Sequence, residues 1–175
     1  MLIGLTATMY GGKTTAANLM LKHLDATIIP FAKPLKEFAR LLGWNGEKDT
    51  KGRRLLQLLG TECGRKCISD NIWVDKWLEQ ALACKTKFVI SDDCRFMNEC
   101  EAILRYKGKI IKVVGRETQL TPIQEIKKRM GLQYCHPSEK PLPSSVPMGY
   151  LVNSGSLFDL ENNVRTLCEV LNGSV

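Results

Sequence analysis

Short apolar runs alternate with helical patterns along most of the chain. The runs predict strands near 2–6, 27–31, 87–91, 109–114 and 149–152. Between them, apolar residues recur every three or four positions, which predicts helices near 13–24, 34–43, 51–67, 70–83, 97–106 and 157–171. Strands that alternate with helices form parallel sheets covered on both faces, so we expect an α/β fold with three layers and about five parallel strands.

Two polar stretches break this alternation. Residues 44–52 are rich in turn-forming residues, and residues 116–147 are rich in charge and proline around a short helical pattern, 124–130. Insertions over the edge of a sheet commonly act as lids. We expect one domain over 1–175, with a helical region at 32–83 and a lid at 116–147.

Composition is ordinary for a globular protein. The 175 residues suit one domain, with 44% hydrophobic and 25% charged residues. No apolar stretch approaches the ~20 residues of a membrane span, and the apolar run at 2–5 is too short for a signal peptide. We therefore expect a soluble cytoplasmic protein without a membrane partner.

Cysteines and net charge add little specificity. The seven cysteines include no CxxC pair; Cys63 with Cys67, or Cys135 beside His136, could be metal ligands, but buried thiols in a reducing compartment are the favoured interpretation. The net charge of +7 suggests binding of phosphate groups. The sequence has no RNP motif, zinc-finger spacing or basic tail, so no stable nucleic-acid partner is expected.

The most informative motif is Ala7–Thr14, ATMYGGKT, between the first strand and the first helix. Backbone N–H groups of such a loop converge on phosphate oxygens, at the positive end of the helix dipole. Lys13 adds an ammonium, and Thr14 a hydroxyl directed at a metal. We expect ATP and Mg²⁺ to bind here, with Gly11 and Gly12 where a Cβ would obstruct the loop and Ala7 as a tolerated variant.

A second candidate cluster is SDDCR, residues 91–95, at the end of a buried strand. A carboxylate there can hold Mg²⁺ or orient a phosphate, and a guanidinium can grip phosphate bidentately. The acids could instead cap the next helix. The favoured interpretation gives the chemical roles to Asp93, as a metal ligand, and Arg95.

Further candidates are weaker. Lys36 begins a helix after the second strand, and Arg54 lies beside Arg53 and three residues before Gln57, so that a guanidinium and an amide share a helix face. Each could contact a phosphate or a base, or be a solvated surface group. His136 could contact a nucleotide or cap a turn, and Asn153 lies in a turn that could contact adenine.

Together these segments resemble the deoxynucleoside monophosphate kinases of phages and large DNA viruses, within the P-loop nucleoside monophosphate kinase superfamily. The matching stretches run in order over almost the whole chain: GLTATMYGGKTTAANLM, FAKPLKE, RRLLQLLGTECGR, DNIWV, VISDDCRFMNECEAI, HPSEKPLP and LVNSGSLFDLENNV.

The resemblance implies a P-loop kinase fold, and transfer of a phosphoryl group from ATP to a deoxynucleoside monophosphate, in the host cytoplasm if the protein is viral. It implies that Asp93 and Arg95 lie between the nucleotides, Asn153 near adenine, and a lid cation, Lys128 or Arg129, over the transferred phosphate. The ATP phosphates and Mg²⁺ would be held by Gly11, Gly12, Lys13, Thr14 and Thr15. The acceptor site would be lined by Lys36, Arg54, Gln57, Gly60, Thr61 and Trp73.

One position departs from the family. Members often read Gly-Lys-Asp in the loop, whereas this chain reads Gly-Lys-Thr at 12–14. A hydroxyl replaces a carboxylate, which makes Asp93 the more important acid in this interpretation.

Two other functions stay open. A related P-loop kinase of dephospho-coenzyme A or phosphomevalonate would share the fold and the loop, and a non-catalytic P-loop protein that binds nucleic acid would account for the charge. The sequence does not rank the deoxynucleotide bases or ribose against deoxyribose. The sequence leaves the oligomeric state open, and an isologous dimer is the commonest assembly among oligomers in general.

Overall fold

A parallel sheet forms the centre of the molecule. The computed structural model describes residues 1–8, 11–47, 49–115, 142–143 and 145–174. All neighbouring strands pair in parallel, in the order β2-β3-β1-β4-β5, which confirms the predicted α/β fold with five parallel strands. The strands are β1 (Leu2–Thr6), β2 (Ala26–Ile28), β3 (Phe88–Ser91), β4 (Lys109–Val114) and β5 (Gly149–Val152).

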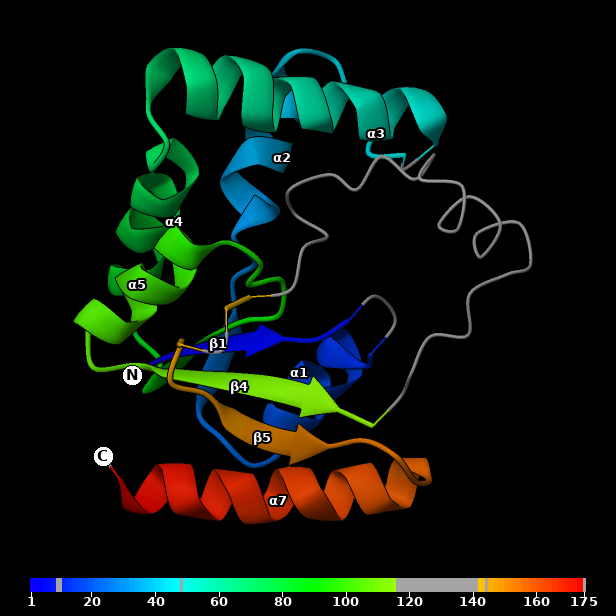
Figure 1. Ribbon diagram of the computed structural model, residues 1–175, viewed down its shortest axis with the longest axis vertical. Helices are drawn as coiled ribbons and strands as arrows, with labels where there is room; N and C mark the ends of the chain where they lie inside the picture. The colour runs from blue at the N-terminus through cyan, green and yellow to red at the C-terminus, as the bar shows by residue number, and fades with distance from the viewer. Residues whose placement is uncertain (9–10, 48, 116–141, 144, 175) are drawn as a thin grey trace.

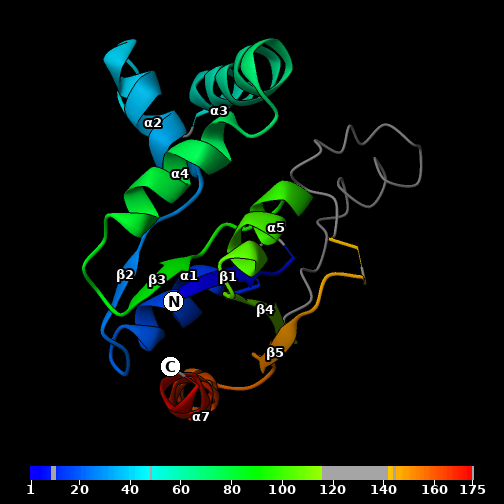
Figure 2. The ribbon, with the colours of Figure 1, turned by 90° about the vertical axis from the view of Figure 1, so that its left-hand side faces the viewer.

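Helices cover both faces of the sheet, as predicted (Figures 1 and 2). On one face, α1 (Lys13–Met20) and α7 (Leu157–Gly173) pack on a core that includes Leu5 and Phe88. On the other, α4 (Ile72–Leu82) and α5 (Met97–Arg105) pack on a second cluster that includes Trp77. Strands buried on both faces are apolar at nearly every position, which explains the continuous runs in the sequence.

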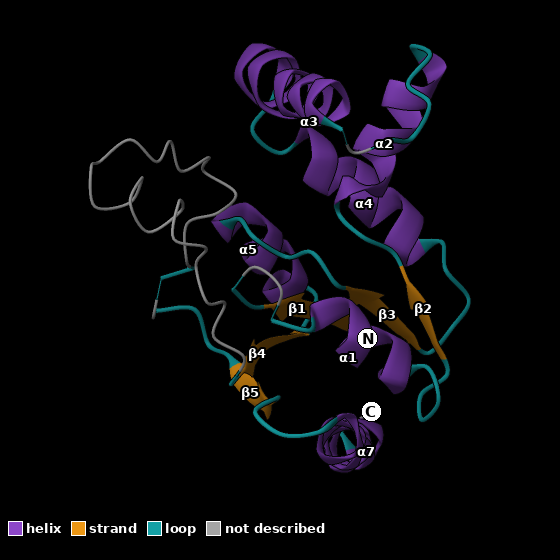
Figure 3. Ribbon diagram, turned by 90° about the vertical axis from the view of Figure 1, so that its right-hand side faces the viewer, coloured by secondary structure: helices purple, strands orange, loops and turns teal. Residues whose placement is uncertain are grey.

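A block of helices is inserted between β2 and β3. It consists of α2 (Ala32–Leu41), α3 (Thr50–Gln57), the π-helix η1 (Leu58–Ile68) and α4, and it occupies the region predicted at 32–83. We call these four elements the helical layer. Figure 3 shows α2 and α3 on the far side of α4 from the sheet, so that only part of this layer touches the central strands.

Several element boundaries differ from the prediction, and three of the differences are instructive. Helix α1 ends at Met20 instead of residue 24, because the next bonds tighten to i,i+3 spacing, from Lys22 N–H to the Leu19 carbonyl (3.0 Å) and from His23 N–H to the Met20 carbonyl (3.0 Å). Strand β2 ends at Ile28, two residues before Pro30, which has no N–H for a ladder. The helix predicted at 51–67 changes from α to π geometry after Gln57.

Two glycines of the π-helix pack against Trp73. The Trp73 indole lies against Gly64, where a Cβ would be 2.7 Å from its Nε1, and that Nε1–H donates to the Gly60 carbonyl at 2.9 Å. The wide turn closes with a bond from Ser69 N–H to the Gly64 carbonyl, 3.1 Å. The sequence shows a helical pattern here but not its width.

Most of the predicted lid lies outside the described residues. Residues 116–141 and Ser144 are among those not described, and with them Lys128, Arg129 and His136. Across the described ranges, no helix combines the length and apolar character that a membrane span requires.

Candidate active site

The loop between β1 and α1 is shaped by its two glycines. Gly12 has φ +89°, and a Cβ there would collide with the Asn153 side chain. At Gly11 a Cβ would lie 2.8 Å from the Ala7 Cβ. Both glycines are therefore required by the loop's own packing. Among the described residues, Lys107 is the one non-glycine with positive φ, so Ala7 is unstrained.

Lys13 lies at the first position of α1 and folds back over the loop. Its Nζ donates to the carbonyls of Ala7 (3.3 Å) and Thr8 (3.4 Å). Burial, followed by the positive charge of Arg95, lowers the pKa of Lys13, while Asp92 and Asp93 act in the opposite direction. The loop, Arg95 and the paired acids therefore share one electrostatic environment.

Thr14 makes the contact that joins the loop to β3. Its hydroxyl donates to Asp92 Oδ2 at 2.7 Å, between residues 78 positions apart in the sequence. A hydroxyl beside a carboxylate offers the hard oxygen ligands that Mg²⁺ takes. The acid in contact with Thr14 is therefore Asp92, whereas the sequence led us to expect the metal ligand at Asp93.

Asp93 instead accepts hydrogen bonds from the start of the helical layer. Its Oδ1 accepts from the backbone N–H of Phe31 at 2.6 Å and from the Ser91 hydroxyl at 3.0 Å, and its Oδ2 accepts from the N–H of Ala32 at 3.0 Å. Burial raises the pKa of this carboxyl, against the lowering effect of the two N–H groups. Asp93 thus holds the start of α2, which is close to the capping role left open by the sequence, although on a preceding helix.

Strand alternation explains why adjacent acids diverge. Phe88 and Ile90 face the core under α1, whereas Val89 faces the cluster under α4. Continuing this period of two, Asp92 falls on the side of α1 and Asp93 on the side of the helical layer. Because the strand is apolar on both faces, its sequence does not show which of its alternating side chains point toward the phosphate loop. The topology of the sheet does.

Arg95 is exposed, and its backbone is fixed. Its N–H donates to Glu99 Oε2 at 2.7 Å, and its charge acts on Lys13. The structure therefore brings Lys13, Thr14, Asp92 and Arg95 together at the carboxyl ends of β1 and β3, where ligands of parallel α/β sheets bind. Thr15 is exposed on the first turn of α1.

Asn153 supports the loop from beneath. Only 2% of it is exposed, and its Nδ2 donates to the Gly11 carbonyl at 3.1 Å, while its own N–H donates to Val114 at 2.6 Å. Its place is thus under the phosphate loop. The adenine contact stays a prediction, and the exposed residues of the same turn are Ser154, Gly155 and Ser156.

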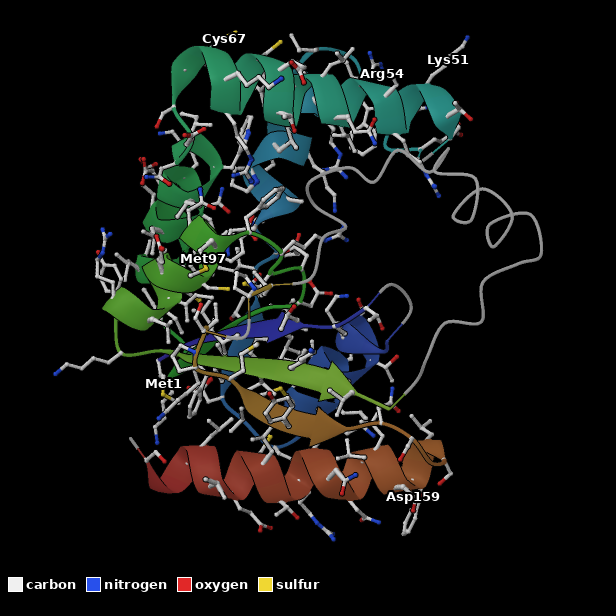
Figure 4. The ribbon with its side chains drawn as sticks, viewed as in Figure 1. Met1, Lys51, Arg54, Cys67, Met97 and Asp159 are labelled. Atoms are coloured by element: carbon white, nitrogen blue, oxygen red, sulfur yellow. The ribbon has the colours of Figure 1, made fainter. Side chains whose placement is uncertain are left out.

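The candidate acceptor residues divide into two groups. Lys36 is half-buried on α2, a turn beyond the bonds made by Asp93, and Thr61 is half-buried on η1. Arg54 and Gln57 are exposed on α3. Figure 4 shows Arg54 on the uppermost helix, across the molecule from α7, so the predicted acceptor groups come from the helical layer and the donor groups from the sheet edge.

Gly60 and Trp73 belong to the packing of the helical layer. Trp73 is 9% exposed and its single N–H donor is used by Gly60, while a Cβ at Gly60 would lie 3.0 Å from Leu35 Cδ2. These contacts give both residues a role in packing, and the prediction that they line the acceptor site stays a prediction.

Comparison with curated proteins gives one informative relative. The chain is 32% identical over 114 residues to the deoxynucleoside-5′-monophosphate kinase of Escherichia phage T5. The chain resembles a deoxynucleoside monophosphate kinase. The match covers 65% of this chain and 42% of the relative, so it spans less than half of that kinase. It confirms the resemblance drawn from the sequence motifs.

Of the two solved structures compared, one supports the fold. TT1252 from Thermus thermophilus aligns over 100% of this chain and 98% of its own, with a TM-score of 0.52 and 18% identity. Shikimate kinase from Bacteroides thetaiotaomicron aligns over 98% of both chains, with a TM-score of 0.46 and 19% identity. No family model matches the chain.

Proposed function

We propose that the chain transfers the γ-phosphoryl group of ATP to a deoxynucleoside monophosphate, giving the diphosphate and ADP. The observation that carries the proposal is the hydrogen bond between Thr14 and Asp92, 2.7 Å, beside Lys13. It joins a phosphate-binding loop to a strand-end carboxylate, which is the arrangement that P-loop phosphotransferases use.

The residues present fit ATP and Mg²⁺. Gly11 and Gly12 place no Cβ at two crowded positions of the loop, and Lys13 supplies a cation that contacts loop carbonyls among the described groups. Thr14 and Asp92 supply oxygen ligands of the kind Mg²⁺ takes. Mg²⁺ bound there would neutralise charge on the β- and γ-phosphate oxygens.

The remaining residues position the two nucleotides. Arg95 lies where a guanidinium can bind phosphate between donor and acceptor, and Lys36 and Arg54 offer cations from the helical layer. Phosphoryl transfer depends on positioning and charge neutralisation more than on proton transfer, so no further acid–base pair is needed. The choice of a deoxynucleotide as acceptor rests on the likeness to the phage T5 enzyme.

An ADP-release assay over ribo- and deoxynucleoside monophosphates tests the proposal. We expect ADP formation that requires both Mg²⁺ and a deoxynucleoside monophosphate, and that falls about 10²–10³-fold in Lys13→Ala. ADP formed at the same rate without any acceptor would refute it. Activity with dephospho-coenzyme A or phosphomevalonate alone would favour the related small-molecule kinases, and steeply salt-dependent DNA binding without transfer would favour a non-catalytic role.

A further inference from the structure

A buried acid outside the predicted site joins two parts of the molecule. Glu99 lies in the first turn of α5 and is 3% exposed. Its Oε2 accepts from the N–H of Arg95 (2.7 Å) and of Phe96 (3.0 Å), and its Oε1 lies 3.3 Å from Arg65 Nη2. One carboxylate therefore holds the backbone of the site loop and a side chain of the helical layer together.

Arg65 is itself held from the helical layer. It projects from η1, its guanidinium lies 4.1 Å from the centre of the Phe96 ring, and its Nη1 donates to the Asp70 carbonyl at 3.3 Å. Beside it, Asn98 Nδ2 donates to the same carbonyl of Asp70 at 2.9 Å. The corner between η1 and α4 is thus fastened to the start of α5 by directional polar bonds.

The same segment also holds the beginning of the helical layer. Asp93 binds the first N–H groups of α2, and Asp92 binds Thr14 of the phosphate loop. Residues 92–99, which we call the junction segment, therefore contact the donor loop, the entry of the helical layer and its far corner. The junction segment therefore links the placement of the helical layer to that of the loop.

Stability alone does not account for a charged pair at this place. An apolar pair of similar volume stabilises a buried interface as well as an ion pair does, because the charges lose their hydration. What the carboxylate adds is direction, since it fixes two N–H groups and a guanidinium at once.

We propose that Glu99 is a positioning residue for phosphoryl transfer, which fixes Arg95 against the phosphate loop and, through Arg65, sets the placement of the helical layer that carries the acceptor. This inference rests on the proposed function. Glu99 touches neither nucleotide, so its influence on the rate passes through Arg95 and Arg65.

The kinetic test uses Glu99→Gln, Arg65→Gln and the double variant. Glu99→Gln keeps the shape and loses the charge, and we expect kcat to fall about 10-fold, in line with a small misplacement of reacting groups, with a raised KM for the acceptor and an unchanged KM for ATP. The double variant should be no worse than the more impaired single variant, because one link is broken in each. Arg65→Lys should recover part of the loss of Arg65→Gln.

Glu161→Gln is the matched control, because Glu161 pairs with Lys22 at 2.7 Å on the opposite face of the sheet. It should leave kcat and both KM values unchanged. If Glu99→Gln and Arg65→Gln behave like this control, the inference is wrong. Equal losses in kcat with every KM unchanged and no recovery in Arg65→Lys would also overturn it.

Amide hydrogen exchange tests the link without relying on activity. In Glu99→Gln we expect faster exchange both at residues 95–98 and at residues 65–72, and in Glu161→Gln at neither. Unchanged exchange at 65–72 would refute the link between the two parts. Absence of acceptor-dependent ADP formation by the wild type would instead refute the proposed function, while the exchange result still decides whether Glu99 joins these segments.

Discussion

The two faces of the sheet are held together in different ways. Under α1 and α7 the contacts are apolar, with Leu5, Phe88 and Val164 fully buried. On the opposite face α4 packs on the sheet through an apolar cluster around Trp77, and the helical layer is tied in addition by polar bonds to Asp93, Asn98 and Glu99. The first face is a rigid platform for the phosphate loop. The second combines apolar packing of α4 with directional bonds that hold the start and the far corner of the helical layer.

Phe88→Ala should have the largest effect on stability. It removes a fully buried ring from the platform, so we expect the free energy of unfolding to fall by about 3–5 kcal/mol in denaturant titrations. Val170→Ala, on the exposed side of α7, is the control and should change it little. A loss below 1 kcal/mol in Phe88→Ala would contradict the description of this face as close-packed.

Asp92→Asn should lower kcat about 10²–10³-fold without loss of stability, since it removes the charge beside Thr14 while the hydroxyl can still donate to the amide oxygen. The readouts are ADP formation and the melting temperature. A normal kcat in this variant would contradict the proposed role of Asp92 as a metal ligand.

Asp93→Asn should show the opposite pattern. An amide cannot accept from Phe31 and Ala32 with both of its atoms, so we expect the free energy of unfolding to fall by about 1–3 kcal/mol. Activity should fall less than in Asp92→Asn when each variant is assayed well below its melting temperature. A larger loss of activity in Asp93→Asn than in Asp92→Asn would favour Asp93 as the acid that binds the metal.

Glu99 should make the stability of the protein depend on pH. Burial raises the pKa of Glu99 to about 7, against an ordinary 4.5, and the groups that face it are Arg65 from η1, Asp93, and the Cys94 and Cys100 thiols. The folded state therefore binds the proton more tightly than the unfolded state, so this group's contribution to stability falls as pH rises from about 4.5 to about 7. The difference between wild-type and Glu99→Gln unfolding curves should show that fall. A flat difference would contradict it.

The smallest effect is expected for the surface pair on the platform. Glu161→Gln breaks an exposed contact with Lys22, and such pairs add little to stability because water screens them. The melting temperature should not change measurably. A clear drop would show that polar contacts also matter on this face.

The sequence was sufficient for the sheet and the loop, because both depend on local patterns. Apolar runs marked the strands, and GGKT marked the turn into α1. It was insufficient to tell which of Asp92 and Asp93 faces the loop. The strand before them is apolar on both faces, so only the topology of the sheet decides this. The sequence also did not show that Trp73 packs against Gly60, because a buried tryptophan and one that lines a site look alike in sequence.

Glu99 was missed for a related reason. Its position in the first turn of α5 is that of an ordinary helix-capping acid, and it is the partner from η1, 34 residues earlier, that gives it a second role. Contacts between segments so far apart leave no periodic signal. The assignment of the lid at 116–147 stays a prediction.

Transfer of the labelled γ-phosphoryl group from ATP to a deoxynucleoside monophosphate is the most direct measurement of the proposed reaction. The wild-type protein, Mg²⁺ and each of the four deoxynucleoside monophosphates are incubated, and the labelled products are separated, with Lys13→Ala as the control. We expect labelled deoxynucleoside diphosphate from the wild type and about 10²–10³-fold less from the variant. Label found only in inorganic phosphate, or transfer unaffected by Lys13→Ala, would contradict a phosphoryl-transfer site at this loop.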